Sequence, residues 1–351
     1  MNMLESIADR QAPADLDVRV PGIIEPQWWT GENAIDLAAF TVNATTFSKV
    51  AGLLEHVRTT YQQLGIARIT NASHLHPPAL RALALAVMEG GMDYEAGANP
   101  RDELEPNVYE VGAPLVAWLH YHHEMAYVGQ SPRSLAFQAR AATPNGPTYF
   151  ADNVAATDAI LATELGQKLL ERGVCYHRIL TDRTRFEGAL PVGVYNHWQQ
   201  SLGTENRDEA EARAQAHGLE TEWGGSGELV TRYHADAFEY FEPLDRNLLF
   251  CSVADHGMWF DGWPLVMHLP YEARPLNMTY GDGTPFTRDE LIEFVQIYDR
   301  AGIRVDWAED DLVVFCNYRF AHGRPGIQLE EGERRELGVL LGPAFNRVGQ
   351  R

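Results

Sequence analysis

Cysteine is scarce in this chain, and its distribution excludes several classes of site. Cys175, Cys251 and Cys316 are the three cysteines among 351 residues. They lie far apart and form no C-x-x-C pair, which argues against a zinc or dithiol motif and against a disulfide framework. A reducing, cytoplasmic compartment is therefore expected.

Basic residues are also few. The 28 Lys+Arg stand against 49 Asp+Glu, for a formal net charge of −21. Binding to nucleic acid or to an anionic membrane needs dense basic patches, so neither partner is expected. A small anionic substrate stays compatible with this charge, because the local charge of a site can oppose the field of the whole molecule.

Long apolar runs are missing as well. No stretch approaches the length of a membrane span, and the first twenty residues carry charges and proline where a signal peptide needs an apolar segment. The sequence therefore predicts a soluble protein.

Apolar periodicity predicts helices at the start of the chain and mostly strands after it. Helical spacing occurs over residues 48–64 and again after Pro77, with a strand between them at 65–70. Beyond residue 105, short apolar runs separated by Gly, Pro and Asn are typical of a β-barrel or sandwich. Helices are expected there at 155–171 and 287–301, and the clearest strands at 134–141, 148–151, 174–180, 248–253, 276–280, 312–316 and 335–342.

The chain reads as one domain over residues 1–351, with a lid-like insertion at about 185–270 that contains an acidic helix. No internal repeat or interdomain linker is evident. Four aromatic residues in the insertion could cover a substrate or simply pack in a core: Tyr195, Trp198, Trp259 and Trp263.

Two histidines and a carboxylate suggest a metal site. His122 and Glu124 are two residues apart, so on a strand both side chains would point to one face. With His322 from a distant strand they would form the two-histidine, one-carboxylate triad of non-haem Fe(II) enzymes. Composition alone predicts an H-x-[D/E] pair about twice in this chain. The second pair is His234 and Asp236, so the spacing is not decisive without its context.

The segment before His322 supports its selection as a ligand. Residues 307–324 combine a buried apolar strand with this histidine, which is expected on a rigid loop at the end of the strand. Trp307 and Asn317 in the same segment are expected to pack and to hydrogen-bond rather than to react. His123 is expected to point away from the metal.

Two other segments could bind an anion. Thr148 follows a glycine turn into a strand, which places its hydroxyl beside the barrel interior. Arg335 shares its alternation with Leu337 and Val339, an apolar and therefore inward face. A buried arginine there needs an anion, best a carboxylate that it binds with two hydrogen bonds. Arg334 falls on the opposite face, although a β-bulge would exchange the two arginines.

The segments HHEMAY, GPTYFAD, WAEDDLVVFCNYRFAHGR and GERRELGVLLG occur in this order along the chain. Together they resemble the taurine dioxygenase/clavaminate synthase-like group of Fe(II)/2-oxoglutarate-dependent dioxygenases, and most closely its natural-product branch of syringomycin-type amino-acid hydroxylases. The resemblance implies a mainly β fold with flanking helices around a double-stranded β-helix (jelly-roll) core. It also implies Fe(II), with 2-oxoglutarate and O2 as co-substrates.

The same resemblance assigns roles to single residues. It implies that His122, Glu124 and His322 ligate the iron. It also implies that Thr148, together with Arg335 or Arg334, binds the far carboxylate of 2-oxoglutarate. Because related halogenases replace the carboxylate ligand with a small residue, Glu124 implies hydroxylation, desaturation, epoxidation or cyclisation. The branch commonly has Asp-Asn where this chain has Cys316-Asn317.

The expected function is oxidation of a C–H bond in a small molecule, an amino acid or an intermediate derived from one, either free or tethered to a carrier protein. Two alternatives stay open at this point. One is a cupin-like metalloenzyme that works without 2-oxoglutarate, and the other is a non-catalytic binding protein on the same barrel. Nothing in the sequence fixes the oligomeric state.

Overall fold

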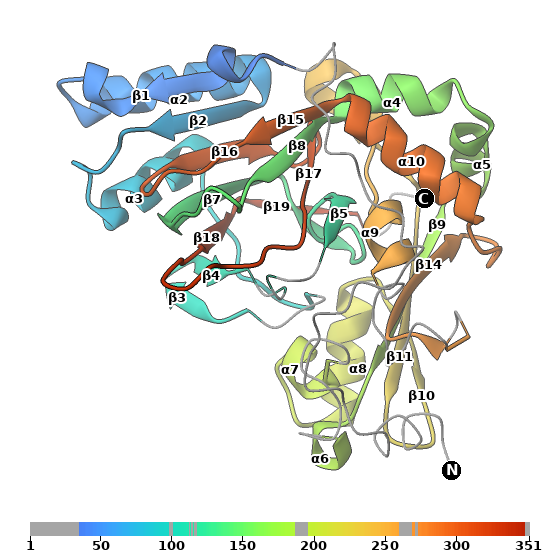
Figure 1. Cartoon of the computed structure of the whole chain (residues 1–351). Helices are drawn as coiled ribbons and strands as arrows, with labels where there is room; N and C mark the ends of the chain where they lie inside the picture. Colours follow the sequence, from blue (N-terminus) through green and yellow to red (C-terminus); the bar gives the residue numbers. More distant parts are fainter. Residues whose placement is uncertain are drawn as a thin grey trace.

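Two β-sheets form the centre of the molecule (Figure 1). The structure is a computed structural model that describes residues 35–97, 101–111, 113, 115, 118–186, 196–259, 269–270 and 273–347. The larger sheet has the order β1 (Thr41–Asn43), β2 (Ile66–Thr70), β16 (Leu312–Cys316), β7 (Ser134–Ala141), β18 (Glu336–Leu341), β4 (Val108–Glu110), β3 (Glu103–Glu105). The smaller has the order β15 (Gly302–Val305), β8 (Thr148–Asp152), β17 (Phe320–Arg324), β5 (Leu119–His122).

The alternation of side chains along β16 explains how the larger sheet is buried on both faces. Val313 and Phe315 belong to the main core, whereas Leu312 and Val314 belong to a second core under the N-terminal helices. Phe315 meets Phe150 of the smaller sheet, with ring centroids 4.9 Å apart. The two sheets therefore face each other across an aromatic interior.

Helices cover the outer faces of both sheets (Figure 1). The larger sheet carries α2 (Val50–Leu64) and α3 (Pro77–Met88), with the short helices η1 (Leu37–Phe40) and η2 (Ala44–Thr46) beside them. The smaller sheet is covered by α4 (Asn153–Leu161) and α10 (Arg288–Arg300), with α5 (Glu164–Arg172) packed on α4. The expected helices at 48–64, after Pro77 and at 287–301 are confirmed.

The single helix expected over residues 155–171 is wrong: α4 and α5 are separate. The Thr163 side chain caps α5 by accepting a hydrogen bond from the Gly166 amide at 3.1 Å. A Cβ on Gly166 would lie 2.0 Å from the carbonyl oxygen of Ile160, so the close turn requires glycine at this position. The helical spacing of apolar residues continues from α4 into α5, so the sequence pattern does not reveal the break between them.

A third sheet and its helices form the lower part of Figure 1, and the remaining elements lie around the two main sheets. This sheet has the order β10 (Glu220–Trp223), β11 (Leu229–Ala235), β9 (Val174–Leu180), β14 (Leu276–Tyr280). The expected strand at 248–253 is found instead at β13 (Arg246–Leu249), and Val253 already belongs to α9 (Val253–Met258). The other elements are α6 (Arg183–Phe186), α7 (Trp198–Leu202), α8 (Arg207–Ala216), β12 (Phe238–Phe241), η3 (Glu242–Leu244), β13 (Arg246–Leu249), α9 (Val253–Met258), β6 (Gln130–Pro132) and β19 (Ala344–Asn346).

Within the expected insertion, β10 and β11 extend a sheet whose other strands, β9 and β14, lie outside it. Of the four aromatic residues that could cover a substrate, Trp198 is buried and Trp259 lines a pocket, while Tyr195 and Trp263 fall outside the described residues. None of the helices in the described segments is both long and apolar enough to cross a membrane.

Candidate active site

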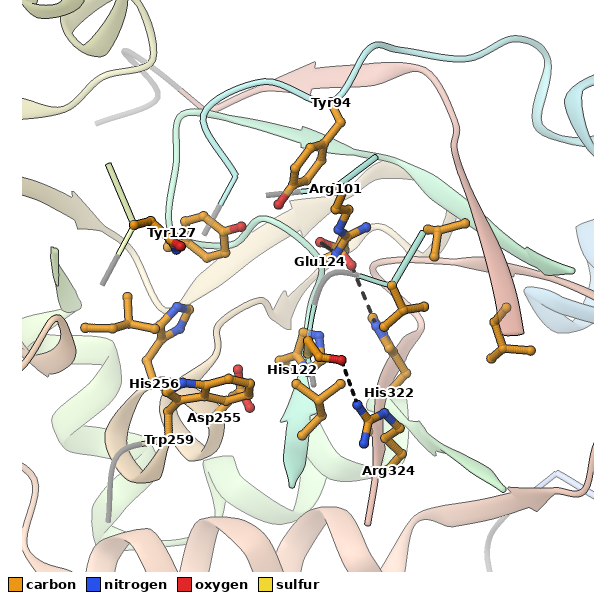
Figure 2. A pocket seen from close by; sticks show the side chains of 18 of the residues that line it. Tyr94, Arg101, His122, Glu124, Tyr127, Asp255, His256, Trp259, His322 and Arg324 are labelled. Carbon is orange, nitrogen blue, oxygen red and sulfur yellow. Dashed lines mark hydrogen bonds and ion pairs between the residues drawn. The ribbon is translucent and has the colours of Figure 1, made fainter. Parts of the chain in front are cut away.

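Strand pairing brings the two candidate histidine ligands together. His322 of β17 is the register partner of His122 at the end of β5, and their ring centroids are 4.2 Å apart. One potential ligand atom each from His122, Glu124 and His322 lies within 4.8 Å of the others (Figure 2). His234 and Asp236 belong to no such group of ligands within the described segments.

Two local expectations about these residues are wrong. His322 lies inside a strand rather than on a loop. Glu124 follows β5 in a turn, where Met125 has a positive φ of 56°, so strand alternation does not explain how its carboxylate reaches the site.

Asn317 holds the Glu124 turn in place. Its Oδ1 accepts from the Glu124 amide at 2.9 Å, and its Nδ2 donates to the Glu124 carbonyl at 3.0 Å and to the Pro132 carbonyl at 2.9 Å. The side chain is fully buried. A buried amide with its hydrogen bonds satisfied fixes the backbone that carries the carboxylate.

The environment of both histidines favours metal binding. His122 Nδ1 lies 2.8 Å from the carbonyl oxygen of His120; a carbonyl only accepts, so Nδ1 donates and Nε2 is the ring atom left to bind a metal. Burial holds the pKa of His322 well below its usual range, so this ring is neutral. Its ring packs against Phe137 and Phe315, with centroids 5.2 and 5.4 Å away.

An arginine that sequence reasoning missed contacts the carboxylate of this group. Arg101 NH2 lies 3.0 Å from Glu124 Oε1, while Glu124 Oε2 faces His322 Nε2 at 3.8 Å. The guanidinium also lies over the Tyr94 ring, 4.6 Å from its centroid. Two imidazoles and one oriented carboxylate, all converging on one point, fit the donor set of an Fe(II) ion.

Thr148 and Arg335 meet in the same pocket. Arg335 is 9% exposed; its Nε donates to the Gly146 carbonyl at 3.0 Å, and its NH2 lies 3.4 Å from Thr148 Oγ1. The Trp307 indole donates to the same hydroxyl oxygen at 2.9 Å. Burial lowers the pKa of Arg335 to about 10. This is the arrangement expected from the sequence for an anion site.

Arg334 does not reach this pocket. Its side chain is 76% exposed and pairs with Glu336 at 3.3 Å. A register shift does occur at Glu336–Leu337, but Arg335 still faces inward, so the exchange of the two arginines does not take place. Arg335 is therefore the arginine that the structure brings to Thr148.

Other polar groups also line the pocket. Arg324 is buried and donates to the carbonyls of Leu115 at 2.8 Å and Ala113 at 3.2 Å. Burial and the neighbouring Arg335 lower its pKa to about 9. Asp255 of α9 accepts from the His120 amide at 3.1 Å, and burial raises its pKa to about 6. Further lining residues include Tyr94, Tyr127, Arg178, His256 and Trp259.

His123 is not part of the site. It follows β5, is fully buried, and its Nδ1 lies 3.1 Å from the Cys251 carbonyl oxygen; it is not among the described residues that line the pocket. The expectation that it is structural agrees with this position. Trp307 and Asn317 also pack and hydrogen-bond as expected.

A family profile described as "Taurine catabolism dioxygenase TauD, TfdA family" matches residues 34–341. This chain belongs to the TauD/TfdA family. Members of this family are 2-oxoglutarate-dependent dioxygenases that use Fe(II) and O2, and this chain is such an enzyme. Neither of the two alternatives left open by the sequence, a non-catalytic binding protein or a metalloenzyme that works without 2-oxoglutarate, is therefore needed to explain this site.

Individual relatives are distant. A clavaminate synthase-like protein of Arabidopsis thaliana is 26% identical over 238 residues, which are 66% of this chain and 69% of that protein. The structure of AAD-2 in complex with Mn(II) and N-oxalylglycine has a TM-score of 0.49 at 14% identity, covering 90% of this chain and 98% of that one. The PvcB protein of Pseudomonas aeruginosa also has a TM-score of 0.49 at 14% identity, covering 97% of each chain.

Proposed function

We propose that this TauD/TfdA enzyme oxidises a C–H bond of a small molecule, an amino acid or an intermediate derived from one, as in the natural-product branch of the family. The observation that carries the proposal is one pocket holding both a converging His122–Glu124–His322 group and a buried Arg335–Thr148 pair. The first would bind Fe(II) and the second the far carboxylate of 2-oxoglutarate.

The chain's own groups bind, orient and exclude water. When bound, Fe(II) with 2-oxoglutarate and O2 supplies the oxidising power that removes a hydrogen from carbon. Arg335 and Thr148 fix the end of the co-substrate that lies away from the metal. The rings of Phe137 and Phe315 keep water from the inner side of His322. Glu124 occupies the position that a halide would need, which favours oxygenation over halogenation.

The same proposal includes the architecture around the site. The strands alternate between the two facing sheets, with β5, β8 and β17 in one and β7, β16 and β18 in the other. This order supports a double-stranded β-helix, or jelly roll, in a single domain. Residues 185–270 would then form the lid over the substrate, in a cytoplasmic enzyme whose substrate is either free or carried by a partner protein.

An anaerobic titration tests the proposal. The metal-free protein receives Fe(II) and then 2-oxoglutarate while visible absorption is followed. A weak charge-transfer band that needs both additions is expected, and it should be absent in His322→Ala. His234→Ala is the matched control, because its histidine belongs to the rival H-x-D pair, and it should keep the band. A band that survives in His322→Ala, or iron binding without a band, contradicts the proposal.

A further inference from the structure

Arg178 is a buried arginine to which the proposed function assigns no role. It belongs to β9, is 3% exposed, and lines the same pocket as the candidate metal ligands. Its alternation along the strand is shared with Tyr176 and Leu180, both buried. Ile179 and Leu180 of the same strand line the pocket as well, so β9 forms part of the pocket wall.

The hydrogen-bond partners of Arg178 in the described segments are all neutral. NH1 donates to the Ala96 carbonyl at 3.0 Å, and NH2 donates to the Gly97 carbonyl at 2.8 Å and to Ser201 Oγ at 3.0 Å. The guanidinium lies 5.5 Å from the centroid of the Tyr127 ring. Within the described segments no carboxylate forms an ion pair with it, and a buried charge without a counter-charge is costly.

The balance of charges in the pocket also leaves Arg178 without a counter-charge. Its described lining holds four arginines but two carboxylates, Glu124 and Asp255. Fe(II) and the 2-oxoglutarate dianion cancel each other, so their binding leaves this surplus of positive charge in place. Arg101 is already paired with Glu124. The far carboxylate of 2-oxoglutarate would pair with Arg335, and the charge of Asp255 acts on Arg324. Arg178 is the arginine left over.

Arg178 also lies apart from the proposed co-substrate anchor. Its partners come from residues 96–97 and 201, whereas Arg335 is held by Gly146 and Thr148. Tyr127 and His256, whose rings are 5.0 Å apart, lie on one side of His122, and Arg324 lies on the other (Figure 2). Arg178 is on the Tyr127 side, so the metal group stands between two cationic ends of one pocket.

We propose that Arg178 binds a carboxylate group of the substrate and so directs the rest of the molecule toward the metal group. A single guanidinium matches a monoanion, and its planar fork suits the two oxygens of a carboxylate. This inference rests on the proposed function and narrows it: the substrate is a carboxylic acid, and the acid is held at the end of the pocket away from Thr148. A strongly acidic chain thus keeps a cationic site for an anionic substrate.

The test uses the protein loaded with Fe(II) and 2-oxoglutarate under anaerobic conditions. The probes are the twenty common L-amino acids and the primary amide of each, and the readout is the perturbation of the charge-transfer band. At least one acid should perturb the band, and its amide should bind at least tenfold more weakly. In Arg178→Met the acid should bind at least tenfold more weakly and no better than its amide, while Arg178→Lys should keep part of the preference.

The control is Ser201→Ala, which removes one partner of Arg178 but leaves its charge, and it should keep the preference for the acid. If Arg178→Met does not fold, Arg178→Gln takes its place. The comparison of acid with amide in the unmodified protein still tests whether the pocket recognises a carboxylate. Equal binding of acid and amide, unchanged binding in the variant, or no response to any acid overturns the inference. Failure of the proposed function is distinct, because the band itself would then not form.

Discussion

Arg101 and Glu124 form a buried ion pair, with 3.0 Å between NH2 and Oε1. Because Oε1 is engaged by the arginine, Oε2 is the oxygen that faces His322. The arginine thereby selects which oxygen of the carboxylate is presented to the candidate metal position. Groups that orient a metal ligand in this way contribute to affinity although they never touch the metal.

Replacing Arg101 should weaken iron binding. We expect Arg101→Met to raise the dissociation constant for Fe(II) roughly tenfold or more, the range typical of partners that orient a ligand. Anaerobic Fe(II) titration measures it. Arg304→Met is the matched control, since that arginine is half exposed and pairs with Asp306. An unchanged affinity in Arg101→Met would show that the pair does not orient Glu124.

Asn317 offers a second test, through the backbone. Asn317→Ala removes three buried hydrogen bonds and leaves the Glu124 amide and carbonyl without these partners. The free energy of unfolding should fall by about 2–3 kcal/mol or more, given the cost of buried unsatisfied groups. Urea denaturation measures this loss, and Fe(II) titration should show weaker binding in the same variant. Full iron affinity with reduced stability would mean that the Glu124 turn keeps its shape by itself.

The two neighbouring arginines make a matched pair for co-substrate binding. Arg335→Met should raise the dissociation constant for 2-oxoglutarate roughly thirtyfold or more, since removing one partner of a buried charge pair costs about 2–5 kcal/mol. Arg334→Met should leave it within about twofold, because that side chain is exposed. Binding is measured from the charge-transfer band at fixed Fe(II). Equal effects of the two substitutions would contradict the assignment of Arg335.

Acid should destabilise the metal-free protein. Burial lowers the pKa of His120, His123 and His256 to about 3 from 6.5. Between these values the unfolded chain binds more protons than the folded one, so stability falls as the pH drops from about 6.5 toward 3. Asp255, with its pKa raised to about 6, acts in the opposite sense between 3.8 and 6 but is one group against three.

The size of this effect can be bounded. Each such histidine changes the free energy of unfolding by at most about 1.4 kcal/mol per pH unit. Urea denaturation at a series of pH values between neutral and mildly acid measures the slope. His256→Phe should reduce the slope of the free energy of unfolding against pH by the contribution of one histidine. A stability that rises on acidification would mean that these histidines are not buried in their neutral form.

Much of the site could be predicted because alternation along a strand is a strong physical constraint. The parity of Arg335 with Leu337 and Val339 predicts that its side chain points inward, and the structure places it there. The rule is weaker for Arg178, which alternates with Tyr176 and Leu180, because Cys175 and Ile179 on the other parity are buried as well. No recognisable motif lies near Arg178 in the sequence either, so the sequence alone does not reveal it.

Other features depend on contacts that the sequence does not reveal. The position of Glu124 is set by Asn317, a residue 193 positions away. Arg101 reaches Glu124 from a segment without any recognisable pattern. The break between α4 and α5 depends on the close approach of Gly166 to Ile160, which spacing alone does not encode. Long-range packing determines these features, and local periodicity does not predict them.

The pairing of His122 with His322 has a consequence for how the enzyme comes into existence. Strands from the two halves of the chain must meet before the ligand group exists at all. A ribosome-bound chain that still lacks β17 therefore has no iron site to fill, and contacts so distant in sequence form slowly because a long loop must close first. Once formed, the site links metal to the whole fold: iron at a hundred times its dissociation constant would add about 2.7 kcal/mol to the free energy of unfolding. Iron supply would then set not only the activity of this enzyme but also how long each copy survives.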